Sequence, residues 1–267
     1  LVLERPASSQ IVSGLVVSAT LAAAPTRIEL RQGTPARPYV DMTLAMLEAF
    51  GGQGAWDGDG ALVVEPATLR GIDTTLEPDA SAASYPLGLA ALYGSRCRIP
   101  ALGRSSLQGD VGFAEVLGRM GARVEQTATE TTVQGTGVLR GGDFDLTDMP
   151  DMTLTLAVLA IHAQGPTRIR GVGILRHHES DRLAAIGTEL RKLGAAVEEH
   201  PDGLSIEPPP GGPRRGVAVD TYDDHRMAMA LSLVGHVVVR DPGCVAKTWP
   251  NYFSVLRKLG MVAYGAP

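Results

Sequence analysis

The chain has 267 residues, enough for one large domain or two smaller ones, and only 4% of them are aromatic, so its core must be aliphatic. A formal net charge of −5 argues against a nucleic acid or a membrane surface as a partner. The two cysteines, Cys97 and Cys244, are too few for a disulfide framework, show no zinc-site spacing, and fit a reducing compartment such as the cytoplasm.

Residues 1–4 (LVLE) are typical of a strand, and because the chain opens on Leu1 we expect it to be part of a longer protein. Residues 11–24 form an uncharged run that resembles the apolar segment of a signal peptide. The same kind of run recurs at 152–161 and 227–235, where no signal peptide can lie, and it is short for a membrane span. We therefore predict a buried core helix over 11–24.

Four helical runs end on a large apolar residue followed by glycine, and these endings lie about 70 residues apart. Glycine accepts the left-handed conformation that follows the end of many helices. The four glycines are Gly51, Gly121, Gly194 and Gly260. Helix starts run in step with them, at Ser8, Ser81, Pro150 and Asp223. Such a period is too long for a solenoid of helical hairpins and predicts a compact α/β unit used four times.

Each unit is predicted to contain a helix, a short strand, a polar loop and a second helix that is amphipathic. The short strands are expected at 27–30, 97–99, 167–169 and 237–240. The second helices carry apolar residues that end at Phe50, Met120, Leu193 and Leu259.

Two further strands follow in the first three units, for example 196–199 and 204–207, which the turn at 200–203 joins into a hairpin. This is an α/β plan with mixed sheets. We place the boundary between two lobes at Glu77 and Pro78, where the first unit ends.

The segment 175–182 (LRHHESDR) opens the second helix of the third unit. Asp181 is placed to cap that helix. Glu179 and Arg182 lie three residues apart on one helix face, as a surface ion pair or as part of a site. The neighbouring histidines have no ligand partner at a defined spacing, which argues against a metal.

The segment 221–230 (TYDDHRMAMA) opens the first helix of the fourth unit and places His225 and Arg226 in its first turn. Positive charge there is unfavourable against the helix dipole, and a bound anion would offset that cost. In the third unit Asp151 stands at the equivalent place, as a helix cap or as a site residue. Lys247 follows in a polar loop, and Cys244 beside it is interpreted as a packing residue.

Six motifs together resemble the 5-enolpyruvylshikimate-3-phosphate (EPSP) synthase family, in order and at the right separations along nearly the whole chain. They are SSQ at 8–10, RPYVDMT at 37–43, MPDMT at 149–153, LRHHESDRL at 175–183, TYDDHRMAMA at 221–230 and DPGCVAKTWPNYF at 241–253. The resemblance implies an inside-out α/β barrel in each of two lobes, three repeats to a lobe. On that plan, 1–77 is the last repeat of the first lobe and 78–267 is the three-repeat second lobe.

The resemblance also implies which residues hold the acceptor, shikimate 3-phosphate. Its 3-phosphate would be bound by Ser8, Ser9 and Gln10, hydroxyl and amide groups at a helix start that suit a phosphate. Tyr39 would lie at the shikimate ring and His178 would be a further contact. Asp151 would contact the 4- and 5-hydroxyls and take the 5-OH proton.

For the donor, phosphoenolpyruvate, the resemblance implies a proton donor and a cationic clamp. Glu179 would protonate C3, and Asp224 would help to orient the clamp. The clamp would consist of Arg182, Arg226 and Lys247, His225 would orient it together with Asp224, and Gln10 and His225 would also contact phosphoenolpyruvate. We expect Asp151, Glu179 and these cations of the second lobe to converge on one cleft.

The implied reaction transfers the enolpyruvyl group to the 5-hydroxyl and releases phosphate, in the shikimate pathway to chorismate and the aromatic amino acids. It needs no metal and no organic cofactor. The full-length protein is expected to be a cytoplasmic monomer. Alternatives are a transferase that acts on UDP-N-acetylglucosamine, and an inactive fragment that keeps the fold.

Three positions depart from the family, which commonly has lysine at His178, asparagine at Ile174 and serine at Ala36. The family's N-terminal Lys-Ser motif, which lies upstream of Leu1 on this alignment, does not occur here. We therefore expect the 267-residue chain by itself to lack transferase activity.

Overall fold

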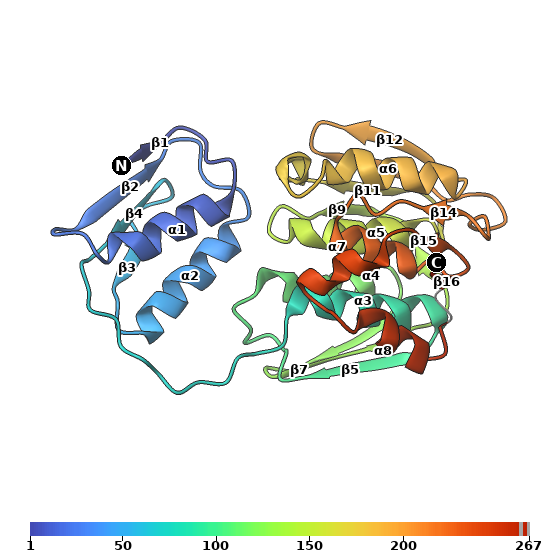
Figure 1. The fold of residues 1–267 in the computed structure, drawn as a ribbon, viewed down its shortest axis with the longest axis horizontal. Coiled ribbons are helices and arrows are strands. Elements are labelled where there is room, and N and C mark those ends of the chain that lie inside the picture. Colours follow the sequence, from blue (N-terminus) through green and yellow to red (C-terminus); the bar gives the residue numbers. More distant parts are fainter. Residues whose placement is uncertain (262–263, 266–267) are drawn as a thin grey trace. The chain divides into compact units, whose positions relative to one another are not determined.

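The structure is a computed structural model that describes residues 1–261 and 264–265 (Figure 1). It divides into two compact units. The N-terminal unit comprises Leu1–Glu77 with the short loops Ser106–Gly109 and Thr147–Met149. The C-terminal unit comprises Pro78–Ser105, Asp110–Leu146 and Pro150–Pro267. Within the described residues, no helix combines the length and the apolar character needed to cross a membrane.

The N-terminal unit packs two helices on a mixed sheet. Its elements are β1 (Val2–Leu3), α1 (Ser9–Ala19), β2 (Thr26–Leu30), α2 (Arg37–Ala49), β3 (Gly54–Trp56) and β4 (Ala61–Val64). The strand order is β1-β2-β4-β3, with β1 parallel to β2 and the other pairs antiparallel. Val12 and Val16 of α1 meet Val40 of α2 and Ile28 and Leu62 of the sheet in an aliphatic core, as the composition required.

The prediction of a buried core helix over 11–24 is wrong in extent and in burial. The helix ends at Ala19, and only one of its faces is buried. Ile11 and Val17 are about half exposed, and Leu21, beyond the helix end, is 86% exposed. The run is uniformly apolar, so hydrophobicity alone could not show which face the sheet would cover.

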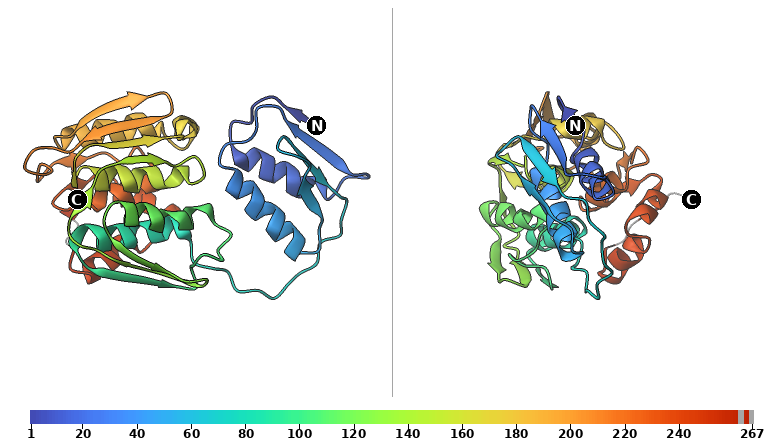
Figure 2. Two further views of the ribbon diagram at one scale, coloured as in Figure 1. Left: turned by 180° about the vertical axis from the view of Figure 1, so that it is seen from behind. Right: turned by 90° about the vertical axis from the view of Figure 1, so that its left-hand side faces the viewer.

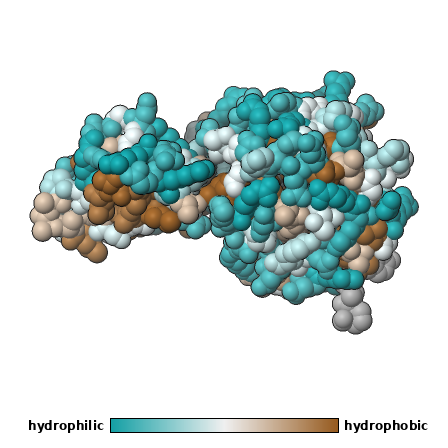
Figure 3. Space-filling view, turned by 90° about the horizontal axis from the view of Figure 1, so that it is seen from above, coloured by the Kyte–Doolittle hydropathy of each residue, from teal (hydrophilic) through white to brown (hydrophobic). Residues whose placement is uncertain are grey.

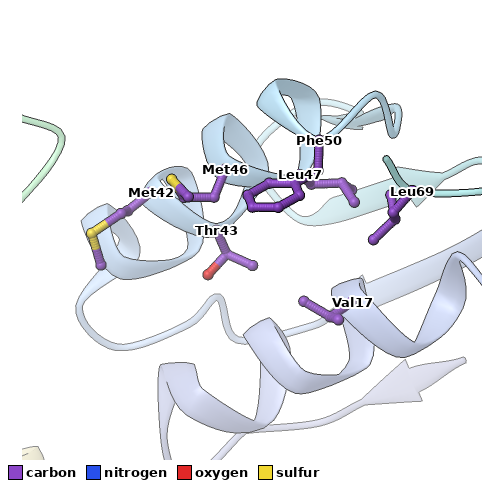
Figure 4. Close-up of a pocket in the computed structure, with 7 residues that line it drawn as sticks. All are labelled: Val17, Met42, Thr43, Met46, Leu47, Phe50 and Leu69. Carbon is purple, nitrogen blue, oxygen red and sulfur yellow. The ribbon is translucent and has the colours of Figure 1, made fainter. Parts of the chain in front are cut away.

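An apolar groove of about 410 Å³ lies beside these helices (Figure 4). Residues of α1, of α2 and of the segment after β4 line it: Val17, Met42, Thr43, Met46, Leu47, Phe50 and Leu69. Figure 3 shows hydrophobic side chains gathered on this unit. The lining contains no charged side chain, so the groove is unsuited to a phosphorylated or carboxylated ligand.

The C-terminal unit is built around three helices that pack on one another. They are α3 (Ala80–Tyr93), α5 (Thr153–Ala160) and α7 (His225–Ser232). Every residue of α5 is buried. Where α3 meets α5, the hydroxyls of Ser84 and Thr155 lie 3.0 Å apart and satisfy each other.

Outer helices and sheets surround these three helices, with β12 and β5 at opposite outer sides of the unit (Figures 1 and 2). The outer helices are α4 (Phe113–Arg119), α6 (Arg182–Lys192) and α8 (Tyr252–Lys258). Four short 3-10 turns precede them or α5: η1 (Gly109–Gly112), η2 (Pro150–Met152), η3 (Gly173–His177) and η4 (Pro242–Lys247).

The strands of this unit form several small sheets. One is β5 (Arg96–Pro100), β7 (Glu130–Gln134) and β6 (Arg123–Gln126), in the order β5-β7-β6. Another is β12 (Ala196–His200), β13 (Gly203–Glu207), β11 (Thr167–Arg170) and β9 (Asp143–Asp145), in the order β12-β13-β11-β9. A third is β14 (Ala218–Val219), β15 (Val238–Val239) and β16 (Tyr264–Gly265), and β8 (Leu139–Arg140) pairs with β10 (Ala163–Gln164).

Two of the sheets share one topology. In both, two parallel strands are followed by two antiparallel additions: β1-β2-β4-β3 in the N-terminal unit and β9-β11-β13-β12 in the C-terminal unit. The sheet β5-β7-β6 repeats the antiparallel part. The predicted hairpin is present, with His200 paired to Gly203 across its turn.

The predicted helix ends are confirmed, because each glycine that follows a second helix has a positive φ. The values are 86° for Gly51, 109° for Gly121, 99° for Gly194 and 81° for Gly260. One apolar assignment is wrong: Leu259 is 62% exposed. Met120 and Leu193 hold the same position after α4 and α6 and are fully buried, so the exposure of Leu259 does not follow from its place at a helix end.

Candidate active site

Arg182 stands at the centre of a buried charged cluster in the C-terminal unit. It is the first residue of α6, which Asp181 caps by accepting the amide of Ala184, as predicted. Its side chain is only 1% exposed. The guanidinium donates to both carboxylate oxygens of Asp224, from Nε at 2.7 Å and from Nη2 at 3.2 Å, and Asp224 is fully buried. This forked pair fixes the plane of the guanidinium.

The two Nη nitrogens of Arg182 also donate to other side chains. Nη1 donates to Asp151 Oδ1 at 3.0 Å and to His178 Nδ1 at 3.0 Å. Nη2 donates to Glu179 Oε2 at 2.8 Å. Three carboxylates therefore share one buried guanidinium, and their attraction to it offsets part of the cost of taking these charges out of water.

Arg226 continues the cluster from the first turn of α7. Its Nη2 lies 2.9 Å from Asp151 Oδ2, so Asp151 bridges Arg182 and Arg226. Asp224 caps α7 by accepting the backbone N–H of Arg226 at 2.9 Å. The anion that the sequence suggested for this first turn is thus supplied in part by the protein's own carboxylates.

Tyr85 is a cluster residue that sequence reasoning missed. It lies on α3, is 2% exposed, and forms a side-chain hydrogen bond with Arg226. Burial raises its pKa to about 12, so the phenol stays protonated. A signal was present in the sequence: Tyr85 lies one helical turn after Ser81, at the helix start that matches Asp151 and Asp224 in the repeat.

Lys247 reaches the cluster from η4 and pairs with Glu179 Oε1. Burial favours the neutral form of Glu179, but the hydrogen bond from Lys247 and the charge of Arg182 outweigh it and lower its pKa to about 2. The Lys247 side chain is 55% exposed. It is therefore the cation of the cluster that solvent reaches most easily.

The two histidines of the cluster are neutral near pH 7. Burial and the charge of Arg182 lower the pKa of His178, and Arg182 donates to its Nδ1, so the ring proton sits on Nε2. Burial and the charge of Arg226 lower the pKa of His225. His225 Nδ1 is buried and has no hydrogen-bond partner among the described residues.

The structure therefore brings together the predicted residues of the second lobe. Glu179, Arg182, Asp224, Arg226, Asp151 and Lys247 form one network of ion pairs, with His178 bonded to it and His225 beside it. Among the described residues, no group of His, Cys, Asp or Glu side chains is arranged to hold a metal ion. Burial raises the pKa of the Cys244 thiol, which keeps it a poor nucleophile.

The other predicted residues belong to the N-terminal unit. Ser8 caps α1, and its hydroxyl accepts the amide of Gln10 at 3.1 Å. Ser9 is buried in the first turn and Gln10 is exposed. Tyr39 lies partly buried in the first turn of α2. The serine hydroxyl thus serves as a helix cap, while the first turn of α1 still offers backbone N–H groups.

Comparisons with known proteins show which family this chain resembles. The model of the family EPSP synthase (3-phosphoshikimate 1-carboxyvinyltransferase) matches residues 2–256. A 3-phosphoshikimate 1-carboxyvinyltransferase of Thiobacillus denitrificans is 45% identical over 94% of this chain and 60% of its own length. The chloroplastic enzyme of that name from Petunia hybrida is 44% identical over 94% of this chain and 51% of its own. The chain thus spans between half and two thirds of these relatives.

Solved structures share the fold. An EPSP synthase of Acinetobacter baumannii matches with a TM-score of 0.78 at 24% identity, covering 98% of this chain and 62% of its own. The enolpyruvyl transferase NikO of Streptomyces tendae matches with a TM-score of 0.73 at 23% identity, covering 94% and 59%. The predicted fold class, the α/β barrel of the enolpyruvyl transferases, is confirmed. By its family match and its fold, this chain is a member of the EPSP synthase family.

Proposed function

We propose that this chain supplies the acid, the base and the donor-binding cations for transfer of the enolpyruvyl group from phosphoenolpyruvate to the 5-hydroxyl of shikimate 3-phosphate. One observation carries the proposal. Positive and negative side chains alternate through shared ion pairs, in the order Lys247, Glu179, Arg182, Asp151 and Arg226. Each of the two carboxylates is therefore held between two cations.

That alternation suits a donor with a carboxylate and a phosphate. Lys247 and Arg226 stand at the ends of the series, and their side chains are more exposed than that of Arg182. Arg182, enclosed by carboxylates, orients Glu179 and Asp151 with respect to each other. An anionic donor would pair with the end cations, in keeping with the bidentate pairing of arginine with phosphate and carboxylate.

Glu179 and Asp151 divide the proton transfers between them. Glu179 donates a proton to C3 of phosphoenolpyruvate, which leaves C2 cationic. The 5-oxygen of the acceptor forms a bond to C2, and Asp151 takes its proton. The C–O bond to phosphate then breaks, a proton leaves C3, and the enolpyruvyl ether and phosphate are the products.

A proton donor must carry a proton, whereas the pKa of Glu179 is about 2 beside Lys247. Binding of phosphoenolpyruvate resolves this conflict. When the anionic groups of phosphoenolpyruvate pair with Lys247, they remove the hydrogen bond that lowers the pKa of Glu179 most and add negative charge nearby, and both changes raise that pKa against the remaining effect of Arg182. Binding of phosphoenolpyruvate thus favours the protonated form of Glu179, which is the form that donates the proton to C3.

The acceptor is proposed to contact Ser8, Ser9, Gln10, Tyr39 and His178 in addition to Asp151. Neutral His178 carries a proton on Nε2 and can donate one hydrogen bond to a hydroxyl, where a lysine would bring a full charge. We also propose a cytoplasmic monomer, which is in keeping with two free cysteines and with the net negative charge.

The proposal is tested by phosphate release from phosphoenolpyruvate in the full-length gene product that carries this chain. Release is expected with shikimate 3-phosphate and not with UDP-N-acetylglucosamine. Release that depends on the nucleotide sugar would assign the protein to the other transferase. No release with either acceptor, from a folded protein, would mean that the fold is kept without the activity.

A further inference from the structure

Another buried carboxylate, that of Glu189, lies on the same face of α6 as Arg182, two helical turns further along the helix. Glu189 is fully buried, and it belongs to none of the groups discussed so far. Its Oε1 accepts from the Tyr222 hydroxyl at 2.7 Å and from Lys192 Nζ at 2.8 Å. Its Oε2 accepts the backbone N–H of Asp220 at 3.1 Å. A buried carboxylate that accepts three hydrogen bonds is held in one position.

The segment that Glu189 holds is a strained turn. The N–H of Asp224 donates to the carbonyl of Thr221 at 2.9 Å and closes a four-residue turn. Its two central residues have positive φ, 57° at Tyr222 and 55° at Asp223. This is the geometry that normally requires asparagine and glycine. Two consecutive side chains in the left-handed region cost about 1–2 kcal/mol each, so other contacts must hold the turn.

The contacts that hold it come from α6 at both ends. Arg182 binds Asp224, where the turn ends, and Glu189 binds Asp220 and Tyr222, where it begins. Lys192 adds a bond to Asp220 at 2.6 Å. The turn ends at Asp224, and His225 and Arg226 follow directly, so the turn sets where these residues lie in the charged cluster.

We propose that Glu189 is a positioning residue that holds the 221–224 turn and thereby places Asp224 and Arg226 in the active site. The assignment deepens the proposed function, on whose site it rests, and adds no contact with substrate. Glu189 acts through Tyr222 and the backbone of Asp220.

The first test uses a conservative substitution, and its measurement does not depend on which reaction the site catalyses. Tyr222→Phe removes the phenol that donates to Glu189 and leaves the half-exposed ring. Hydrogen exchange of the Asp224 and Arg226 amides is expected to rise about fivefold or more, as for loss of one hydrogen bond that opposes local opening. Tyr93→Phe is the matched control, because its hydroxyl donates to the Leu233 carbonyl, away from the 221–224 turn. Unchanged exchange in Tyr222→Phe would overturn the proposal.

The second test is rescue. Glu189→Gln keeps the size but cannot accept from all three donors, so the turn is expected to relax. Asp223→Gly then removes one left-handed side chain and its cost. In the full-length gene product, we expect Glu189→Gln to raise KM for phosphoenolpyruvate about tenfold as Arg226 shifts, and the double variant to recover most of that loss. A merely structural Glu189 would lower the active fraction, leave KM unchanged, and gain nothing from Asp223→Gly.

The two tests separate this inference from the proposed function. If amide exchange responds to Tyr222→Phe while the wild-type full-length gene product shows no transferase turnover, the positioning role of Glu189 stands and the proposed activity is wrong. If Glu189→Gln does not fold, the exchange experiment on Tyr222→Phe still decides. If turnover is normal and exchange, KM and rescue are all unaffected, Glu189 has no positioning role.

Discussion

Arg182 carries its charge in a place that water hardly reaches, and the carboxylates around it make that possible. Asp224, fully buried, gives it two of its bonds. Removing one partner of a buried ion pair leaves the other charge uncompensated, which is far more costly than breaking an exposed pair.

The stability of the C-terminal unit should therefore depend strongly on Asp224. Asp224→Ala is expected to lower the free energy of unfolding by about 3 kcal/mol or more. Asp143→Ala is the control, because Asp143 pairs with Arg170 at 2.9 Å at an exposed site and should cost less than about 1 kcal/mol. Urea denaturation of the chain measures both. Equal losses in the two variants would show that the buried pair contributes nothing special.

Acid should destabilise the protein by protonating the carboxylates of Glu179 and Asp224. The pKa of Glu179 falls from an ordinary 4.5 to about 2, and the pKa of Asp224 is lowered from 3.8, because Lys247 and Arg182 outweigh the effect of burial. A group with a lowered folded-state pKa stabilises the fold above its unfolded pKa and loses that contribution as the pH falls.

We therefore expect the unfolding free energy to fall as the pH drops from 4.5 towards 2. Lys247→Met, which removes the main cause of the Glu179 shift, should make this fall shallower. Denaturation midpoints measured at several pH values test it. A wild-type midpoint that stays level across this interval, or a steeper fall in Lys247→Met, would show that the ion pair is not formed in solution.

At the scale of the element, helix α6 combines a local start signal with two long-range anchors. Asp181 caps it, and Arg182 and Glu189 then hold the 220–224 segment. Asp181→Ala is expected to lower the unfolding free energy by about 1 kcal/mol, while Asp181→Asn, which keeps a cap, should lose only a small part of that. If both variants lose the same amount, the pairing of Asp181 with Arg176 matters more than the cap.

What the sequence predicted at this scale is mostly local. The cap at Asp181, the glycines after the second helices and the hairpin that turns at 200–203 each depend on a few neighbouring residues, and all are present. The burial of α1 was wrong because it depends on which face the sheet covers. Glu189 was missed because its partner Tyr222 lies far along the chain and no local pattern marks the pairing. Tyr85 was missed although its place one turn after the helix start at Ser81 was a signal, because its partner Arg226 is also distant in sequence.

At the scale of the whole molecule, the starts of three helices explain why residues distant in sequence form one site. Asp151 lies just before α5 and Asp224 just before α7, and Arg182 begins α6, the helix between them in sequence. Because the starts of these helices lie together, three segments of the chain place charged side chains in one cluster. The motifs predicted the charged members of this cluster but not Tyr85, and they did not show that Arg182 would be enclosed while Lys247 stays exposed.

The central claim is that Glu179 is the proton donor of an enolpyruvyl transfer, and Glu179→Gln in the full-length gene product tests it most directly. Glutamine keeps the shape and a hydrogen bond but has no proton to give, so kcat should fall on the order of 10²-fold or more with little change in KM. Glu199→Gln, which disturbs an ion pair with Arg191 outside the cluster, should leave both constants unchanged. A near-normal kcat for Glu179→Gln would contradict the claim and leave Glu179 as no more than an ion-pair partner of Arg182 and Lys247.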